Sequence, residues 1–159
     1  MLDKLLERIN ELGGIQYFEK KNKDGIIINR HTRIPQVIVT LEDFFEGMPE
    51  SCTHNYACNI NFASNAGFSD FEFYELFKTV REKEMVQDVW VELSDYDPEE
   101  YEYPYSETCY ISTAANEDEL MKWFGDVAFP SEIHICEDGE IEGIPTIKVG
   151  YTLFCCWWD

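Results

Sequence analysis

The sequence predicts an α+β domain in which an antiparallel sheet carries two helices on one face. Capped amphipathic segments alternate with strand-sized apolar segments, and from residue 57 onward their order is strand, helix, strand, then strand, helix, strand. This is the order of a split βαβ layout with a ferredoxin-like tendency. A chain of 159 residues that is 45% hydrophobic can bury one core. We therefore expect a single domain over 1–159, with a core at 41–159 and an N-terminal helix and hairpin extension at 1–40.

The N-terminal extension combines a helix with a hairpin. Leucine and isoleucine recur at spacings of three and four over residues 2–12, and Gly13-Gly14 follows, which predicts an amphipathic helix that ends at a glycine cap. The Asp24-Gly25 pair is typical of a hairpin turn. The strands of this extension are expected at residues 15–20, 26–29 and 36–39.

Capping residues predict the helices of the core. Thr40 with Asp43, and Ser69 with Glu72, have the spacing of capping boxes, in which a side-chain oxygen accepts an exposed backbone N–H. Asn116 begins a further helix that ends at a glycine. The expected helices are 40–47, 69–84 and 116–125. The expected strands are 57–62, 88–93, 108–112, 133–136, 146–149 and 152–157, with a turn at 137–140.

Charge is the unusual property of the composition. Lys and Arg number 12 against 32 Asp and Glu, a net charge of −20, which argues against binding to nucleic acid or to an anionic membrane surface. No apolar run approaches the roughly 18 residues that span a bilayer. The first ten residues lack the apolar region of a secretory signal. We expect a cytoplasmic protein whose six cysteines are reduced and mostly buried.

Acidic residues and tyrosines are concentrated in one segment. Residues 1–33 are slightly basic, whereas residues 82–107 contain ten carboxylates and one lysine. Tyrosine is enriched at protein interfaces, and carboxylates attract and orient a basic partner. We expect this segment to bind a basic protein partner through Asp95, Asp97, Glu99, Glu100, Tyr101, Glu102, Tyr103 and Tyr105. The alternative is a solvated loop whose charge only keeps the protein soluble.

Catalytic and metal-binding motifs are incomplete. Cys52, His54 and Cys58 offer thiol and imidazole groups, which zinc prefers, but a fourth ligand is missing. The sequence has no local signature of a Cys–His nucleophilic pair and no phosphate-binding glycine loop. We therefore expect a non-enzymatic binding protein without a cofactor or metal. The alternative is a small-ligand or metal-binding protein, or an enzyme, with a site near these three residues.

The last expected strand ends in two adjacent tryptophans. Because successive side chains of a strand point to opposite faces, Trp157 and Trp158 should lie on opposite sides of the sheet. Either one indole is exposed as a contact surface, or the N-terminal helix or hairpin covers both.

Several segments together resemble a widespread family of small, acidic, uncharacterised bacterial proteins. They are Leu41-Glu42-Asp43-Phe44-Phe45-Glu46-Gly47, Cys58-Asn59, Phe73-Tyr74, Val86-Gln87-Asp88-Val89-Trp90-Val91-Glu92, Tyr105-Ser106, Tyr110-Ile111, Trp123 and Trp157-Trp158-Asp159. The resemblance covers residues 36–159; residues 48–57 replace the Gly- and Asp-rich stretch usual in the family. Such proteins look like the immunity components of bacterial toxin systems. The resemblance implies a stoichiometric inhibitor that occludes a basic partner, such as a nuclease toxin.

Overall fold

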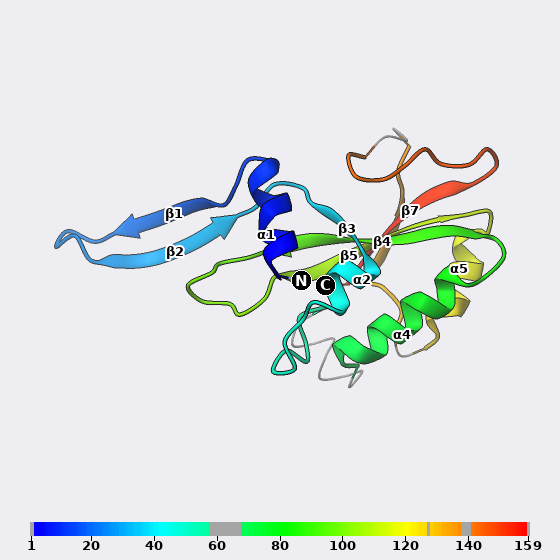
Figure 1. The fold of residues 1–159 in the computed structure, drawn as a ribbon, viewed down its shortest axis with the longest axis horizontal. Helices are drawn as coiled ribbons and strands as arrows, with labels where there is room; N and C mark the ends of the chain where they lie inside the picture. The colour runs from blue at the N-terminus through cyan, green and yellow to red at the C-terminus, as the bar shows by residue number, and fades with distance from the viewer. Residues whose placement is uncertain (1, 58–67, 127, 138–140, 159) are drawn as a thin grey trace.

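The computed structural model describes residues 2–57, 68–126, 128–137 and 141–158. It confirms the α+β class: helices cover one face of a five-stranded antiparallel sheet, and a separate two-stranded hairpin projects from this body (Figure 1). The predicted strand at 57–62 falls almost wholly outside the described residues, as does most of the predicted turn at 137–140. In the described ranges no helix is both long and apolar enough to cross a membrane.

The N-terminal region consists of α1 (Leu2–Glu11), β1 (Gln16–Lys21) and β2 (Ile27–Arg33). The amphipathic prediction for α1 is confirmed, because Leu5 and Ile9 are buried in the main core. Among the described residues, strands β1 and β2 pair only with each other. Their turn is closed by the Asn22 side chain, whose oxygen accepts the backbone N–H groups of Asp24 and Ile26. The hairpin therefore folds locally, as the Asp-Gly pair predicts.

The main sheet has the strand order β3-β4-β5-β7-β6, with every pair antiparallel. Its strands are β3 (Ile38–Thr40), β4 (Val86–Asp95), β5 (Tyr105–Thr113), β6 (Glu132–Ile135) and β7 (Thr152–Trp157). The helix α5 (Glu117–Phe124) connects β5 to β6, and β7 lies between these two strands. This unit is the split βαβ connection that the sequence predicts.

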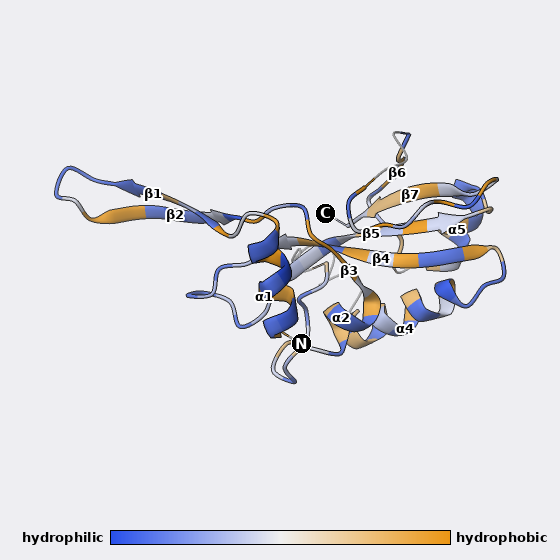
Figure 2. Cartoon of the chain, turned by 45° about the horizontal axis from the view of Figure 1, so that its top comes forward, coloured by the Kyte–Doolittle hydropathy of each residue, from blue (hydrophilic) through white to orange (hydrophobic). Residues whose placement is uncertain are grey.

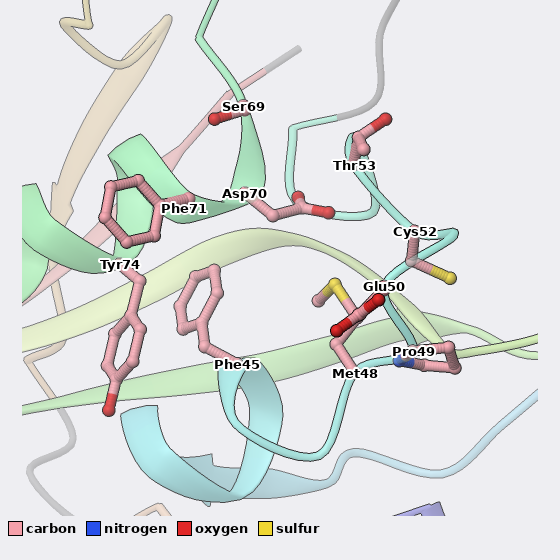
Figure 3. A pocket seen from close by; sticks show the side chains of 10 residues that line it. All are labelled: Phe45, Met48, Pro49, Glu50, Cys52, Thr53, Ser69, Asp70, Phe71 and Tyr74. Carbon is pink, nitrogen blue, oxygen red and sulfur yellow. The ribbon is translucent and has the colours of Figure 1, made fainter.

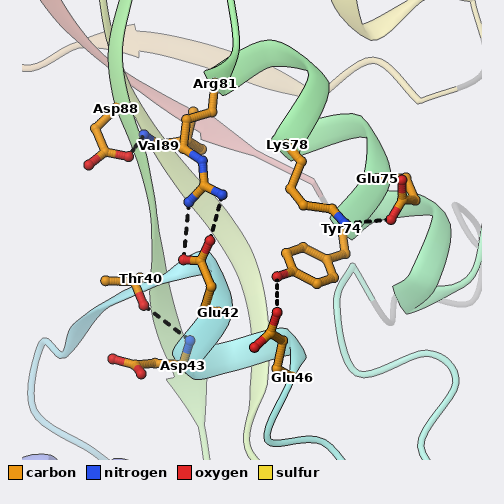
Figure 4. Close-up of polar contacts among 10 residues, drawn as sticks. All are labelled: Thr40, Glu42, Asp43, Glu46, Tyr74, Glu75, Lys78, Arg81, Asp88 and Val89. Atoms are coloured by element: carbon orange, nitrogen blue, oxygen red, sulfur yellow. Dashed lines mark hydrogen bonds and ion pairs between the residues drawn. The ribbon is translucent and has the colours of Figure 1, made fainter.

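Three helices begin at the predicted capping residues. They are α5, α2 (Leu41–Phe45) and α4 (Asp70–Arg81). The Thr40 hydroxyl accepts the backbone N–H of Asp43 in the first turn of α2 (Figure 4), and the Asn116 side chain accepts that of Glu119 in α5. Ser69 and Glu72 form a reciprocal capping box at the start of α4. These helix starts are confirmed because each depends on residues only three positions apart.

The main core lies between the helices and the sheet. Trp158 is fully buried there among aromatic rings from α4 and α5, and its indole N–H donates to the Ala128 carbonyl oxygen at 3.1 Å. Trp157 is partly exposed. Aromatic side chains of α4 and α5 therefore cover the Trp158 indole, and the hypothesis that both indoles are covered does not hold for Trp157.

A smaller core covers the opposite face of the sheet. Trp90, Tyr110 and Leu153 pack there against the segment 141–147, and Figure 2 shows hydrophobic residues along β4 and β7. The predicted strand at 146–149 is wrong, because this segment forms turns and coil. The Gln87 side chain replaces a strand partner: it donates to the Thr146 carbonyl and accepts the Lys148 N–H, both at 3.1 Å.

Candidate functional site

The acidic segment between β4 and β5 is held by the hairpin of its own chain. The Thr32 hydroxyl donates to Asp95 at 2.8 Å, and the Arg30 guanidinium pairs with Asp97 at 3.2 Å and with Glu99. The hydrogen bond to Glu99 raises the pKa of Arg30 above its ordinary value. Asp97 is 3% exposed, which corrects the expectation that it pairs with a partner at the surface.

Tyr103 is a core residue, which corrects its expected role as a partner anchor. It is 0% exposed, and its hydroxyl donates to the carbonyl oxygens of Phe44 at 2.7 Å and Asp43 at 3.2 Å. Burial raises its pKa. Alternating tyrosines would share one face in an extended strand, but the chain bends at residues 102–103. Tyr103 therefore turns inward and ties this segment to α2.

Tyr101 and Tyr105 wall an open hollow with a volume of about 620 Å³. Their rings meet edge to face, with centroids 4.8 Å apart. We call this site the acidic hollow, and its lining residues are His54, Ser94, Asp95, Tyr101, Tyr105, Ser106 and Glu107. In the described part of the chain, no lysine or arginine lines it. Glu100 and Glu102, on either side of Tyr101 in the chain, are exposed but are not among the residues that line this hollow, and the Glu102 carboxylate accepts the Ser51 hydroxyl at 2.7 Å.

Backbone pairing fixes the walls of the acidic hollow. Ser106 donates its N–H to the Asn55 carbonyl at 3.0 Å, and the Ala57 N–H donates to the Ser106 carbonyl at 2.8 Å. These two hydrogen bonds place His54 beside β5. Because His54 is about 50 residues away from β5 in the sequence, this contact could not be predicted from local sequence. The Ser94 hydroxyl accepts the Glu107 N–H at 3.1 Å. Glu107 lies in the predicted acidic run, so charge density alone could have identified it.

A second cavity of about 410 Å³ lies between α2 and the first turn of α4 (Figure 3). We call it the aromatic pocket, and its walls are formed mainly by Phe45, Met48, Pro49, Phe71 and Tyr74. Asp70 also lines it and is almost fully buried. The Asp70 carboxylate accepts backbone N–H groups from Asn55 at 2.8 Å and Tyr56 at 2.6 Å. Burial raises the pKa of Asp70.

Contacts between α2 and α4 fix the shape of the aromatic pocket (Figure 4). Arg81 donates two hydrogen bonds to Glu42, at 2.5 and 3.1 Å, and these lower the pKa of Glu42. The Tyr74 hydroxyl donates to Glu46 at 2.8 Å. Bidentate arginine pairs restrict geometry more strongly than single contacts. The two helices are therefore held together at both ends of α2.

Cys52 and His54 do not meet at one site. Cys52 lines the aromatic pocket, His54 lines the acidic hollow, and Cys58 lies outside the described residues. Burial raises the pKa of Cys52, which keeps its thiol protonated and poorly nucleophilic. Within the described ranges, no group of three His, Cys, Asp or Glu side chains is placed to hold a metal ion. The five cysteines that the structure describes are free thiols.

The fold and these two concave sites define an acidic α+β domain with a projecting hairpin. The chain belongs to the Uncharacterized protein YfbO family, whose model matches residues 2–156. A relative, the Uncharacterized protein YfbO of Escherichia coli (strain K12), is 30% identical over 158 residues, which cover 97% of this chain and 98% of the relative. No solved structure matches the chain. The predicted family of uncharacterised bacterial proteins is confirmed, and the match includes the N-terminal helix and hairpin.

Proposed function

We propose that this protein is a non-catalytic binding protein whose acidic hollow captures a basic side chain of a protein partner. One observation carries the proposal: the hollow combines two tyrosine rings with the carboxylates of Asp95 and Glu107. A guanidinium can stack on an aromatic ring and donate two hydrogen bonds to a carboxylate. Arginine therefore fits both kinds of group that line this hollow.

Long-range electrostatics supports a basic partner. The chain carries a net charge of −20, and such a charge raises the association rate of a partner of opposite sign. Arg30 neutralises part of the acidic segment through Asp97 and Glu99. Asp95 and Glu107 line the hollow itself, and the exposed Glu100 adjoins Tyr101 in the chain, so we expect the attraction to act at this part of the surface.

The partner in this proposal is a basic toxin of the nuclease type, which the bound protein would inhibit by occluding its active site. A nuclease needs a basic surface to hold the phosphate backbone, and that surface is complementary to the acidic hollow. Inhibition of this kind is stoichiometric, because the inhibitor binds and performs no chemistry. Complexes between nucleases and their immunity proteins reach Kd values on the order of 10⁻¹³ M or below.

Three variants of the full chain test the proposal. The first neutralises the two carboxylates that line the hollow, with Asp95→Asn and Glu107→Gln. The matched control removes the same charge elsewhere with Glu82→Gln and Glu84→Gln, both exposed positions. The third, Tyr101→Ala, removes one aromatic wall and keeps the charge. Immobilised wild type and the variants are exposed to a cell lysate, and each retained protein is purified for binding kinetics.

The proposal expects a basic protein that binds wild type and the control variant. Its association rate should fall by about tenfold with the neutralised hollow, with a flatter salt dependence. Tyr101→Ala should mainly raise its dissociation rate. Retention of no basic protein, or equal binding by all variants, refutes the acidic hollow as the site. If the retained partner is a nuclease, one equivalent of this protein should abolish its activity. Nuclease activity that persists at this ratio would show that the protein is not an inhibitor.

A further inference from the structure

The hairpin formed by β1 and β2 exposes a large apolar surface. Figure 1 shows it extending away from the body, and in Figure 2 the start of β2 is hydrophobic whereas the turn is hydrophilic. The side chains of Ile26, Ile27 and Ile28 are 61%, 47% and 57% exposed. Two-stranded hairpins are marginally stable alone in water, and exposed apolar patches of this kind mark interaction sites. In the part of the chain that the structure describes, the isoleucines of the outer hairpin are therefore an uncovered apolar surface.

The hairpin differs in charge from the rest of the chain. Residues 15–33 contain five Lys or Arg and two Asp or Glu, a net charge of +3. The remaining residues contain seven Lys or Arg and 30 Asp or Glu, a net charge of −23. Lys20, Lys21 and Lys23 lie at the outer end beside the isoleucines. A surface that complements the outer end of the hairpin is apolar and has acidic residues at its rim. The chain itself carries a surface of this kind.

The aromatic pocket is apolar and has a carboxylate at its rim. Phe45, Met48 and Tyr74 line it, and Phe71 stands at its edge with 70% of its surface exposed. The exposed carboxylate of Glu50 also lines it. No lysine or arginine is among its lining residues in the described part of the chain. Lys78, the basic residue that packs on the Tyr74 ring, is already paired with a glutamate of α4.

We infer that the hairpin of one copy docks in the aromatic pocket of a second copy of this chain. Ile26 and Ile28 enter between the aromatic side chains, and the neighbouring lysines face Glu50. The base of the hairpin stays attached to its own body through the contacts of Arg30 and Thr32 with the acidic segment. Reciprocal docking of two hairpins buries both isoleucine clusters and both pockets in a closed two-fold dimer.

The mass of the full-length protein tests this inference. Analytical ultracentrifugation across the micromolar range should give a dimer, twice the 18.7 kDa of one chain. Ile26→Ser with Ile28→Ser, or Phe71→Glu alone, should weaken dimerisation by at least about tenfold, as truncation of interface anchors does. All three positions are exposed, so circular dichroism should report an unchanged fold. The control Val149→Ser removes a fully exposed apolar side chain elsewhere and should leave the dimer intact.

A mixing experiment tests the pairing itself. The hairpin variant retains an intact pocket, and the Phe71→Glu variant retains an intact hairpin. Each should be monomeric alone, and together they should form a heterodimer through one hairpin and one pocket. A wild type that stays monomeric overturns the inference, as does a dimer that survives in both variants. Mixed variants that do not associate also overturn it, since a different surface would then join the two copies.

Discussion

Replacing Asp70 by alanine should destabilise the fold through a defined set of lost contacts. The carboxylate, 5% exposed, accepts the N–H groups of Asn55 and Tyr56. Each buried N–H left without an acceptor costs about 1–3 kcal/mol. Part of this cost is offset because the buried carboxylate is itself poorly solvated, as its raised pKa indicates. The net loss for Asp70→Ala is about 2–4 kcal/mol, and Asp70→Asn, which keeps one acceptor oxygen, should lose about half as much.

Urea unfolding followed by tryptophan fluorescence measures this loss, because Trp158 is buried in the main core. For a domain of this size, the expected loss corresponds to a fall in Tm of about 5–15 °C. The exposed Asp126→Ala is the matched control and should change the free energy of unfolding by less than about 0.5 kcal/mol. If Asp70→Ala unfolds within that same margin of wild type, the two hydrogen bonds do not hold the 53–57 segment on α4.

The pH dependence has a defined sign. Burial raises the pKa of Asp70 in the folded state above its value in the unfolded chain, so the folded state binds the proton more tightly. By linkage, the stability contributed by Asp70 is greatest below its unfolded pKa and falls as the pH rises to its folded pKa. The stability difference between wild type and Asp70→Ala should therefore narrow from mildly acidic to neutral pH. If the stability difference between wild type and Asp70→Ala instead widens toward neutral pH, burial does not raise the pKa of Asp70.

Two further predictions concern the helices and the segment on the opposite face. Arg81 lowers the pKa of Glu42, so this pair should stabilise the fold above the unfolded pKa of Glu42 and cease to do so as the pH falls through its folded pKa. Because the pair is partly exposed, a double-mutant cycle with Glu42→Gln and Arg81→Met should give about 0.5–1 kcal/mol at neutral pH, and no coupling would contradict it. Gly143→Ala should cost about 1–2 kcal/mol by calorimetry. The residue has φ +94°, and an added Cβ would lie 3.1 Å from the Ile38 Cβ; an unchanged Tm would show that the segment shifts freely.

Local patterns predicted the helices well and the strands less well. The capping residues Thr40, Ser69 and Asn116 mark helix starts because their hydrogen bonds span three residues. Strands β4 and β5 are longer than predicted, since their ends are defined by pairing with each other through register shifts. The segment 146–149 has a strand-like composition, but the Gln87 side chain binds its backbone instead of a neighbouring strand. Strand identity depends on a partner that local sequence does not contain.

The candidate site was also predicted only in part from local sequence. The sequence by itself determined where negative charge and tyrosine accumulate, because composition is a property of the chain alone. Only the tertiary structure decided that Tyr101 and Tyr105 wall a hollow while Tyr103 enters the core. It also placed the basic hairpin against Asp97 and Glu99, over 60 residues away along the chain. Burial and ion pairing depend on which distant segments pack together, and that choice is made by the whole core rather than by neighbours in sequence.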